Sequence, residues 1–306
     1  AASIYHPARL ALISLHIRDR GRALGINGVA GNFGIAGGPA IGMLAASLGV
    51  WRMAYAVLAI VAFLSSLLML RLLRHPMPAE EVAHTPTPGT VSGPSENRSW
   101  KRFLPIALLL GAMTLAGFNY RSLITGLPVY VNGGTELPKG IDKYTNSAFL
   151  FLVVLIGGFG QYFGGWAVTR FGGRVYAYLL ALMAPLAILL VFMEAHPARI
   201  LVVGVLAVFL FAQQPVENLL LAEWTSKSRR GVSYGTKFAL TFGLGALGAP
   251  YIGVILRANQ SVAPAFYGIA ASACLMILLI FLALRARARA MQVSTTSTAT
   301  EPSNSR

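Results

Sequence analysis

Charged residues are scarce in this chain, at 11% of 306 residues, against about 25% in an ordinary globular protein. Cysteine occurs once, at Cys274, which excludes an intramolecular disulfide and a cysteine-based metal cage. The sequence has no Gly-x-x-x-x-Gly-Lys-Ser/Thr loop for nucleotide phosphates, which excludes an ATP-driven pump within this chain. It also shows no metal-ligand spacing and no recognisable catalytic triad. We therefore expect no metal, no cofactor and no enzymatic activity.

Long apolar runs take the place of charge. Residues 53–70, 103–120, 238–256 and 258–284 carry no charge, and hydrophobic residues make up 56% of the chain. A helix of a water-soluble protein has one apolar stripe, whereas these runs are apolar all round. Crossing the hydrocarbon core takes roughly 20 such residues. The sequence predicts an all-α, polytopic membrane protein whose function lies in a membrane-crossing path.

Nine spans are expected, and the charge between them predicts their orientation. Short clusters of Arg and Lys alternate with gaps that are short or mixed in charge. The positive-inside rule places the basic gaps and the C-terminus in the cytoplasm. Lipid headgroups account for the net charge of +15, so we expect no nucleic-acid partner. The expected spans are 1–17, 23–48, 51–73, 103–127, 145–169, 175–194, 199–222, 232–256 and 262–285.

A proline-rich segment divides the chain. Residues 75–101 combine five prolines with Ser, Thr and Glu, a composition that does not build a core. We predict a partial N-terminal bundle at 1–74, a disordered cytoplasmic linker at 75–101, a six-helix C-terminal bundle at 102–290 and a disordered cytoplasmic tail at 291–306.

An internal repeat relates the first three spans to the last three. Ordered landmarks recur with offsets that drift from 208 to 212 residues, as a true repeat with small insertions would. The spans at 103–194 have no counterpart, so we expect about three further spans, roughly 107 residues, before Ala1. The intact protein would then have two six-helix halves, with a substrate path between them. The matching pairs are Pro7 and Pro215, Gly21 and Gly231, Gly42 and Gly253, and Tyr55 and Tyr267.

Two motifs carry a family resemblance. Gly34-x-x-x-Gly38-Pro39-x-x-Gly42 resembles the helix-five signature of proton-coupled exporters in the major facilitator superfamily. Glycines one turn apart allow helices to approach closely, and proline bends a helix. The resemblance implies that nine of twelve family helices are present, here helices four to twelve.

The second motif lies at the end of the expected span 145–169. Gly165, Arg170, Gly172 and Arg174 have the spacing of the family's short cytoplasmic loop after helix eight. The family usually has Asp where this chain has Thr169, which weakens any charge-relay role for this loop. Separately, the pattern Tyr-His-Pro-Ala near the start is similar to fosmidomycin-resistance-like exporters.

Ionisable groups inside spans are costly and are functional candidates for that reason. Glu217 is a candidate proton or cation site, or else a helix-end carboxylate in a hydrated vestibule. Arg9 is its partner in the repeat, and we hypothesise that the two pair and help to close the cytoplasmic side; the alternative is an arginine that snorkels. Arg121 is either a ligand for an anionic substrate group or an outer-interface anchor.

Other polar groups are candidates for a substrate path. His6 titrates near neutral pH or is simply a packing residue beside proline. An amide within a bilayer must find a partner, so amide side chains are expected to line a cavity. The amide candidates are Gln161, Gln213, Gln214 and Asn218.

The sequence therefore favours a secondary active transporter of the cell membrane that works by alternating access. The first hypothesis is a monomer that exports a small organic compound or drug in exchange for protons. The first alternative is uptake of an organic anion by symport, motivated by Arg9 and Arg121. The second alternative is a transport-dead, truncated membrane scaffold or gene remnant.

Overall fold

The computed structural model describes residues 2–74, 103–131, 142–194 and 198–299. This described part is built from helices, with no strand. The predicted linker at 75–101 lies outside the described residues. The ten α-helices are α1 Ala2–His16, α2 Arg20–Ser47, α3 Met53–Leu73, α4 Leu104–Val131, α5 Asp142–Phe171, α6 Val175–Phe192, α7 Arg199–Trp224, α8 Arg230–Gly243, α9 Gly248–Asn259 and α10 Ala265–Ala299.

The all-α membrane architecture predicted from the sequence is confirmed. Within the described ranges, eight helical segments are long and apolar enough to cross a membrane. The described α1 has 15 residues, fewer than a full crossing needs. Large apolar side chains, such as those of Phe63, Phe192 and Leu201, are exposed on the outer surface. That surface suits hydrocarbon, where no water competes for the backbone groups that each helix satisfies internally.

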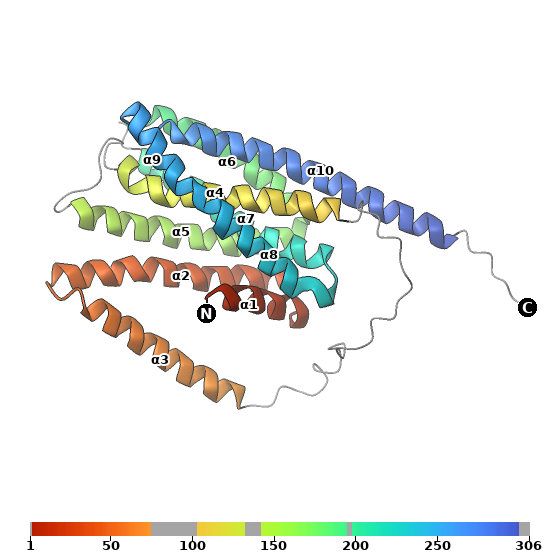
Figure 1. Cartoon of the computed structure of the whole chain (residues 1–306), viewed down its shortest axis with the longest axis horizontal. Helices are drawn as coiled ribbons and strands as arrows, with labels where there is room; N and C mark the ends of the chain where they lie inside the picture. Colours follow the sequence, from red (N-terminus) through yellow and green to blue (C-terminus); the bar gives the residue numbers. More distant parts are fainter. Residues whose placement is uncertain (1, 75–102, 132–141, 195–197, 300–306) are drawn as a thin grey trace, which may run out of the picture.

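Figure 1 shows the helices running side by side, with α3 diverging from the rest. α5 packs between α2 and α7, α6 packs against α7, and α10 packs against both α4 and α6. α1 lies against α8. The N-terminal helices α1 and α2 therefore join the later helices through α8 and α5, whereas α3 is exposed along most of its length.

Glycines allow α5 to approach both of its neighbours. A Cβ on Gly165 would overlap the Gly21 carbonyl oxygen of α2, and a Cβ on Gly25 would come 2.8 Å from the Gln161 carbonyl oxygen. On the side of α7, a Cβ on Gly164 would overlap the Ala212 carbonyl oxygen. Small residues at such crossings bring backbones together and maximise contact where the hydrophobic effect does not drive association.

The close packing expected at Gly34, Gly38 and Gly42 is not found among the described residues, because a Cβ at any of them meets nothing within 4 Å. The physical reason is rotational: Asn32 faces α5, and Gly34 follows it by two residues, about 200° around the helix. The side chain of Pro39 lies outside the described residues. Instead, α2 contacts α5 through Gly21 and through the glycines one and two turns after it.

The span predicted at 232–256 lies within one continuous helical span, Lys227–Asn259. It consists of α8, a short 3-10 turn over Leu244–Leu247, and α9. The turn lies against α4, where a Cβ on Gly245 would come 2.9 Å from the Gly117 carbonyl carbon. Three glycines within six residues weaken the helix and allow this approach.

The last helix is longer than predicted. α10 runs to Ala299, whereas the sequence predicts a span ending at 285 and a disordered tail at 291–306. Alternating Arg and Ala at 285–290 are strong helix formers and extend the helix beyond the apolar run, but the Ser and Thr residues that follow are weaker helix formers, so propensity does not account for the last turns. Residues 300–306 lie outside the described part of the chain.

Candidate functional site

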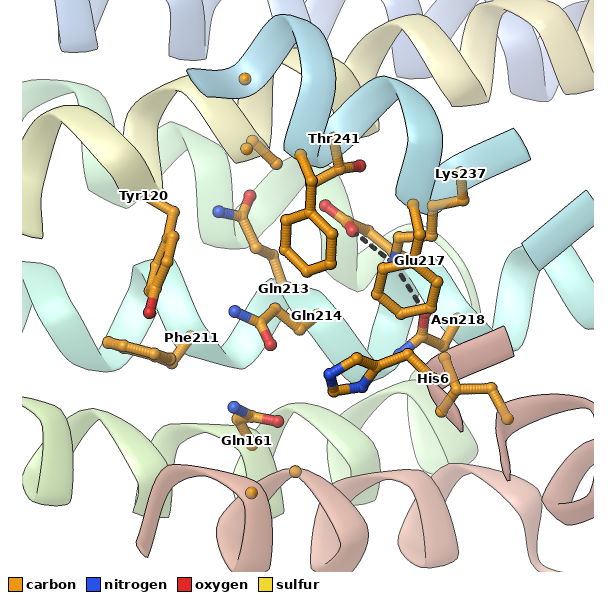
Figure 2. Close-up of a pocket in the computed structure, with 18 of the residues that line it drawn as sticks. His6, Tyr120, Gln161, Phe211, Gln213, Gln214, Glu217, Asn218, Lys237 and Thr241 are labelled. Carbon is orange, nitrogen blue, oxygen red and sulfur yellow. Dashed lines mark hydrogen bonds and ion pairs between the residues drawn. The ribbon is translucent and has the colours of Figure 1, made fainter. Parts of the chain in front are cut away.

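One cavity of about 440 Å³ lies among α1, α2, α4, α5, α7 and α8. The structure brings together around it all eight polar residues that the sequence analysis proposed for a substrate path. Figure 2 labels all of them except Arg9 and Arg121. The first and last of them are more than 200 residues apart in the chain, so only the tertiary fold makes them neighbours. The eight are His6, Arg9, Arg121, Gln161, Gln213, Gln214, Glu217 and Asn218.

A buried ion pair is the centre of charge in this cavity. Glu217 Oε2 lies 2.9 Å from Lys237 Nζ, and the two side chains are 3% and 5% exposed. The Tyr176 hydroxyl donates to Glu217 Oε1 at 2.6 Å, so both carboxylate oxygens have partners. Lys237 Nζ also donates to Asn218 Oδ1 at 2.6 Å (Figure 2). Tyr234 fixes the same stretch of α7 by donating to the Asn218 carbonyl oxygen at 2.8 Å.

Lys237 is the functional candidate that sequence reasoning missed. It lies inside the predicted span 232–256, directly before the uncharged run that starts at Phe238. The rule that selected Glu217, that an ionisable group within a span is costly, selects Lys237 equally well. The chain fold supplies the reason for its presence, because α8 carries it to the carboxylate on α7.

The predicted pair between Arg9 and Glu217 is not formed in this structure. Arg9 lines the same cavity, but its guanidinium contacts the Tyr5 hydroxyl at 3.3 Å and His6 Nδ1 at 3.4 Å. Its Nε is buried and has no hydrogen-bond partner among the described residues. Glu217 is already neutralised by Lys237, the closer cation on the neighbouring helix. Arg9 is thus left as a cation that no described carboxylate pairs with.

Amide side chains line the side of the cavity next to α2 and α5. Gln161 Nε2 donates to Asn32 Oδ1 at 3.0 Å, and Asn32 in turn donates to the Val154 carbonyl oxygen at 3.2 Å. Gln213 is 1% exposed, and its Oε1 accepts no hydrogen bond from the described residues. A buried acceptor without a donor is costly, so Gln213 Oε1 is a group that a bound molecule would satisfy.

Aromatic rings form the apolar walls. Tyr120 meets Phe211 edge to face with 5.6 Å between ring centroids, and Phe238 stacks on Phe242 at 5.3 Å. The His6 ring lies 5.2 Å from that of Phe238. Because the cavity combines apolar ring walls with charged and amide side chains, it suits a small molecule with an apolar ring or chain and polar groups.

α1 and α2 contact later helices at one end of the bundle. The sequence predicts that this end faces the cytoplasm. Arg230 is 5% exposed and donates to the Ser14 carbonyl oxygen at 2.6 Å and to the Ala222 carbonyl oxygen at 3.1 Å. Thr169 donates to Asp19 Oδ1 at 3.5 Å. At this end Arg230, and not a pair of Arg9 with Glu217, joins α1 to α7, and it caps the last turns of both helices.

The predicted loop motif lies beside these contacts. Gly165 packs against Gly21, and Gly172 ends α5 with a φ of +73°, a conformation that favours glycine. Arg170 and Arg174 are exposed on either side of this turn. The motif therefore forms a tight turn between α5 and α6 and a contact with α2.

The variant Arg230→Gln is expected to lower the free energy of unfolding by about 2 kcal/mol, because two buried carbonyl oxygens lose a charged donor. Denaturant unfolding of the purified protein, followed by tryptophan fluorescence, measures this. Arg229→Gln is the matched control, since Arg229 is the exposed neighbour. Equal losses in the two variants would show that the bonds to Ser14 and Ala222 contribute nothing.

The described residues contain no group of three His, Cys, Asp or Glu side chains that would hold a metal ion. The helices and their apolar outer surface define a membrane protein, and a cavity with a polar and apolar lining lies between its helices.

The family is then identified by comparison. The family model of the Major Facilitator Superfamily matches residues 1–216, and the chain belongs to this superfamily of membrane transporters. No curated protein matches the sequence. Members of this superfamily are generally not enzymes, which agrees with the sequence-based expectation.

Proposed function

We propose that this protein is a secondary active transporter that carries small organic anions through the central cavity by alternating access. The observation that supports the proposal most directly is the charge of the lining. Three basic side chains, Arg9, Arg121 and Lys237, line the cavity with a single carboxylate, Glu217. After the Lys237 pair is formed, two arginines have no described carboxylate partner.

The chemistry of the lining also defines the shape of the substrate. An arginine presents a planar fork of donors that matches a carboxylate or phosphonate. The rings of Phe238 and Phe242 pack against an apolar or aromatic portion. A donor on the substrate would satisfy the free acceptor of Gln213. A small aromatic acid with an amide or hydroxyl group has all three features.

Transport follows if the two ends of the cavity open in turn. The contacts of Arg230 with Ser14 and of Gly165 with Gly21 would separate to open the predicted cytoplasmic end. We also propose that the substrate is exported in exchange for protons, which the Gly-Pro pattern of α2 supports. We further propose that the protein acts as a monomer in the cell membrane, with its C-terminus in the cytoplasm.

The test measures flux of radiolabelled p-aminohippurate into liposomes that contain the protein produced from its complete reading frame. We expect saturable flux of this aromatic anion and little flux of its uncharged amide or of benzyltrimethylammonium. Replacing both Arg9 and Arg121 by glutamine is expected to lower the anion flux by about tenfold or more, equivalent to about 1.4 kcal/mol.

Arg257→Gln is the matched control, because Arg257 is exposed on α9 and bonds only within its own helix. Equal flux of the anion, the amide and the cation would overturn the anion proposal. Flux that never exceeds that of empty liposomes, with folded protein, would favour the alternative of a membrane scaffold.

A further inference from the structure

Three exposed arginines, here called the arginine cluster, lie where α10 leaves its apolar run. Arg174 follows the turn between α5 and α6, and Arg285 directly follows the apolar part of α10. The two segments are in contact, because a Cβ on Gly173 would come 3.7 Å from a methyl group of Leu284. Arg289 lies one turn beyond Arg285 on the same face of α10. The cluster therefore spans the junction between the α5–α6 turn and α10.

The arginine cluster has no anionic partner in the described part of the chain. Arg174 and Arg289 form no hydrogen bond or ion pair there, and the Arg285 guanidinium contacts only an aromatic ring. α6 and α10 carry no carboxylate. Glu223, near the end of α7, lies within electrostatic range of Arg287, which is half-buried on the other side of α10. The counter-ion of the cluster must therefore come from outside these helices.

Apolar surface lies directly next to the arginine cluster. Phe281 and Leu278, one and two turns before Arg285 on the same face of α10, are exposed. Tyr178, one turn after Arg174 on α6, is exposed as well. α6 and α10 pack against each other along their length (Figure 1). The surface thus changes at this level from apolar side chains, which suit acyl chains, to cations, which suit headgroup phosphates.

One of these arginines is held in a defined orientation. The central guanidinium carbon of Arg285 lies 4.1 Å from the centroid of the Phe281 ring. This stacking uses the flat face of the guanidinium, so the N–H donors along its edge stay free. Such an edge matches two oxygens of a phosphate group. Arg285 is therefore oriented to bind a phosphate at the boundary between apolar and charged surface.

We propose that the arginine cluster binds one anionic phospholipid, with its phosphate between the α5–α6 turn and α10 and its acyl chains along α6 and α10. Basic pockets between membrane helices bind anionic headgroups in this way. The proposal is separate from the transport of substrate anions, because the cluster does not line the cavity. The bound lipid joins the α5–α6 turn to α10 and stabilises the folded protein, since it binds only where the two segments meet.

The first test needs no variant. Native mass spectrometry counts the lipids that stay bound to the complete protein in mild detergent with equal amounts of dioleoyl-phosphatidylglycerol and dioleoyl-phosphatidylcholine. The two lipids have the same acyl chains and differ in headgroup charge. We expect one phosphatidylglycerol to be retained with a preference of about tenfold or more, and the preference to fall at high salt. An excess of glycerol 3-phosphate, which has the phosphate without acyl chains, is expected not to displace it.

Variants then locate the site. Changing all three arginines of the cluster to glutamine is expected to remove the preference for phosphatidylglycerol. The matched control is the triple variant Arg18→Gln, Arg22→Gln and Arg229→Gln, which removes three exposed arginines from the same end of the bundle. Within α10, Arg285→Gln is expected to lower the retention, whereas Arg287→Gln is expected to leave it unchanged.

The outcomes that contradict the proposal are distinct. Equal retention of the two lipids by the unaltered protein overturns it. Equal loss of the preference in the two triple variants also overturns it, because the net charge of this end would then account for the binding. Displacement by glycerol 3-phosphate overturns it as well, because the site would then recognise a free phosphate ester. None of these results depends on the flux of p-aminohippurate, so the proposed function stands or fails separately.

Discussion

Replacing Glu217 by leucine is expected to lower the free energy of unfolding by about 3–5 kcal/mol, the range for removing one partner of a buried ion pair. Lys237 is 5% exposed and would lose its counter-ion, with Asn218 as its remaining acceptor. The Tyr176 hydroxyl, also buried, would lose its acceptor. Denaturant unfolding of the purified protein in detergent measures the loss.

The double variant Glu217→Leu with Lys237→Met is the control, and it is expected to recover most of the stability. With both charges removed, two apolar side chains of similar volume fill the same space, and such replacements are often neutral. Glu217→Gln is expected to be milder than leucine because it keeps an acceptor for Tyr176. If the single and double variants lose equal stability, the ion pair is not what stabilises this region.

The second large effect is expected for Gly164→Ala. A Cβ at this position would overlap the Ala212 carbonyl oxygen, which is backbone and has no flexible end to move. α5 and α7 would have to separate along a seam that also includes Gly160 and Val208. Overpacking of this kind costs about 1–3 kcal/mol and occasionally more. We expect a value at the upper end, with a loss of monodisperse protein in size-exclusion chromatography.

Gly204→Ala on α7 is the matched control. A Cβ there meets nothing within 4 Å, and alanine is the better helix former by about 1 kcal/mol. The control is therefore expected to be neutral or stabilising, whereas Gly164→Ala is destabilising. Similar behaviour of the two variants would mean that α5 and α7 do not approach as closely as the structure shows.

The helices could be predicted because each depends on its own residues. The apolar runs place the helical spans close to their observed positions, and the bilayer leaves no other stable structure for such runs. Hydropathy does not show the short 3-10 turn over Leu244–Leu247 within the span predicted at 232–256. It also does not show that the last helix continues to Ala299, beyond the predicted end of the span at 285.

The sequence predicted which residues line the candidate site, but not which of them pair with each other. The rule that polar groups are rare inside a membrane selected Glu217, Arg9 and Gln213, and all three line one cavity. The same rule did not say which groups pair. The repeat favoured Arg9 as the partner of Glu217, but the structure gives Lys237, on the helix that packs directly beside the carboxylate.

The sequence by itself determined that the chain is a helical membrane protein with few, and therefore informative, polar groups. That much depends on composition and on residue order within each span. Only the tertiary structure decided that Glu217 pairs with Lys237, that Arg9 has no described carboxylate partner, and that α2 meets α5 at Gly21 and not at Gly34. Those outcomes depend on how helices rotate and pack against one another, because a shift of one residue turns a side chain by about 100° and changes its neighbour.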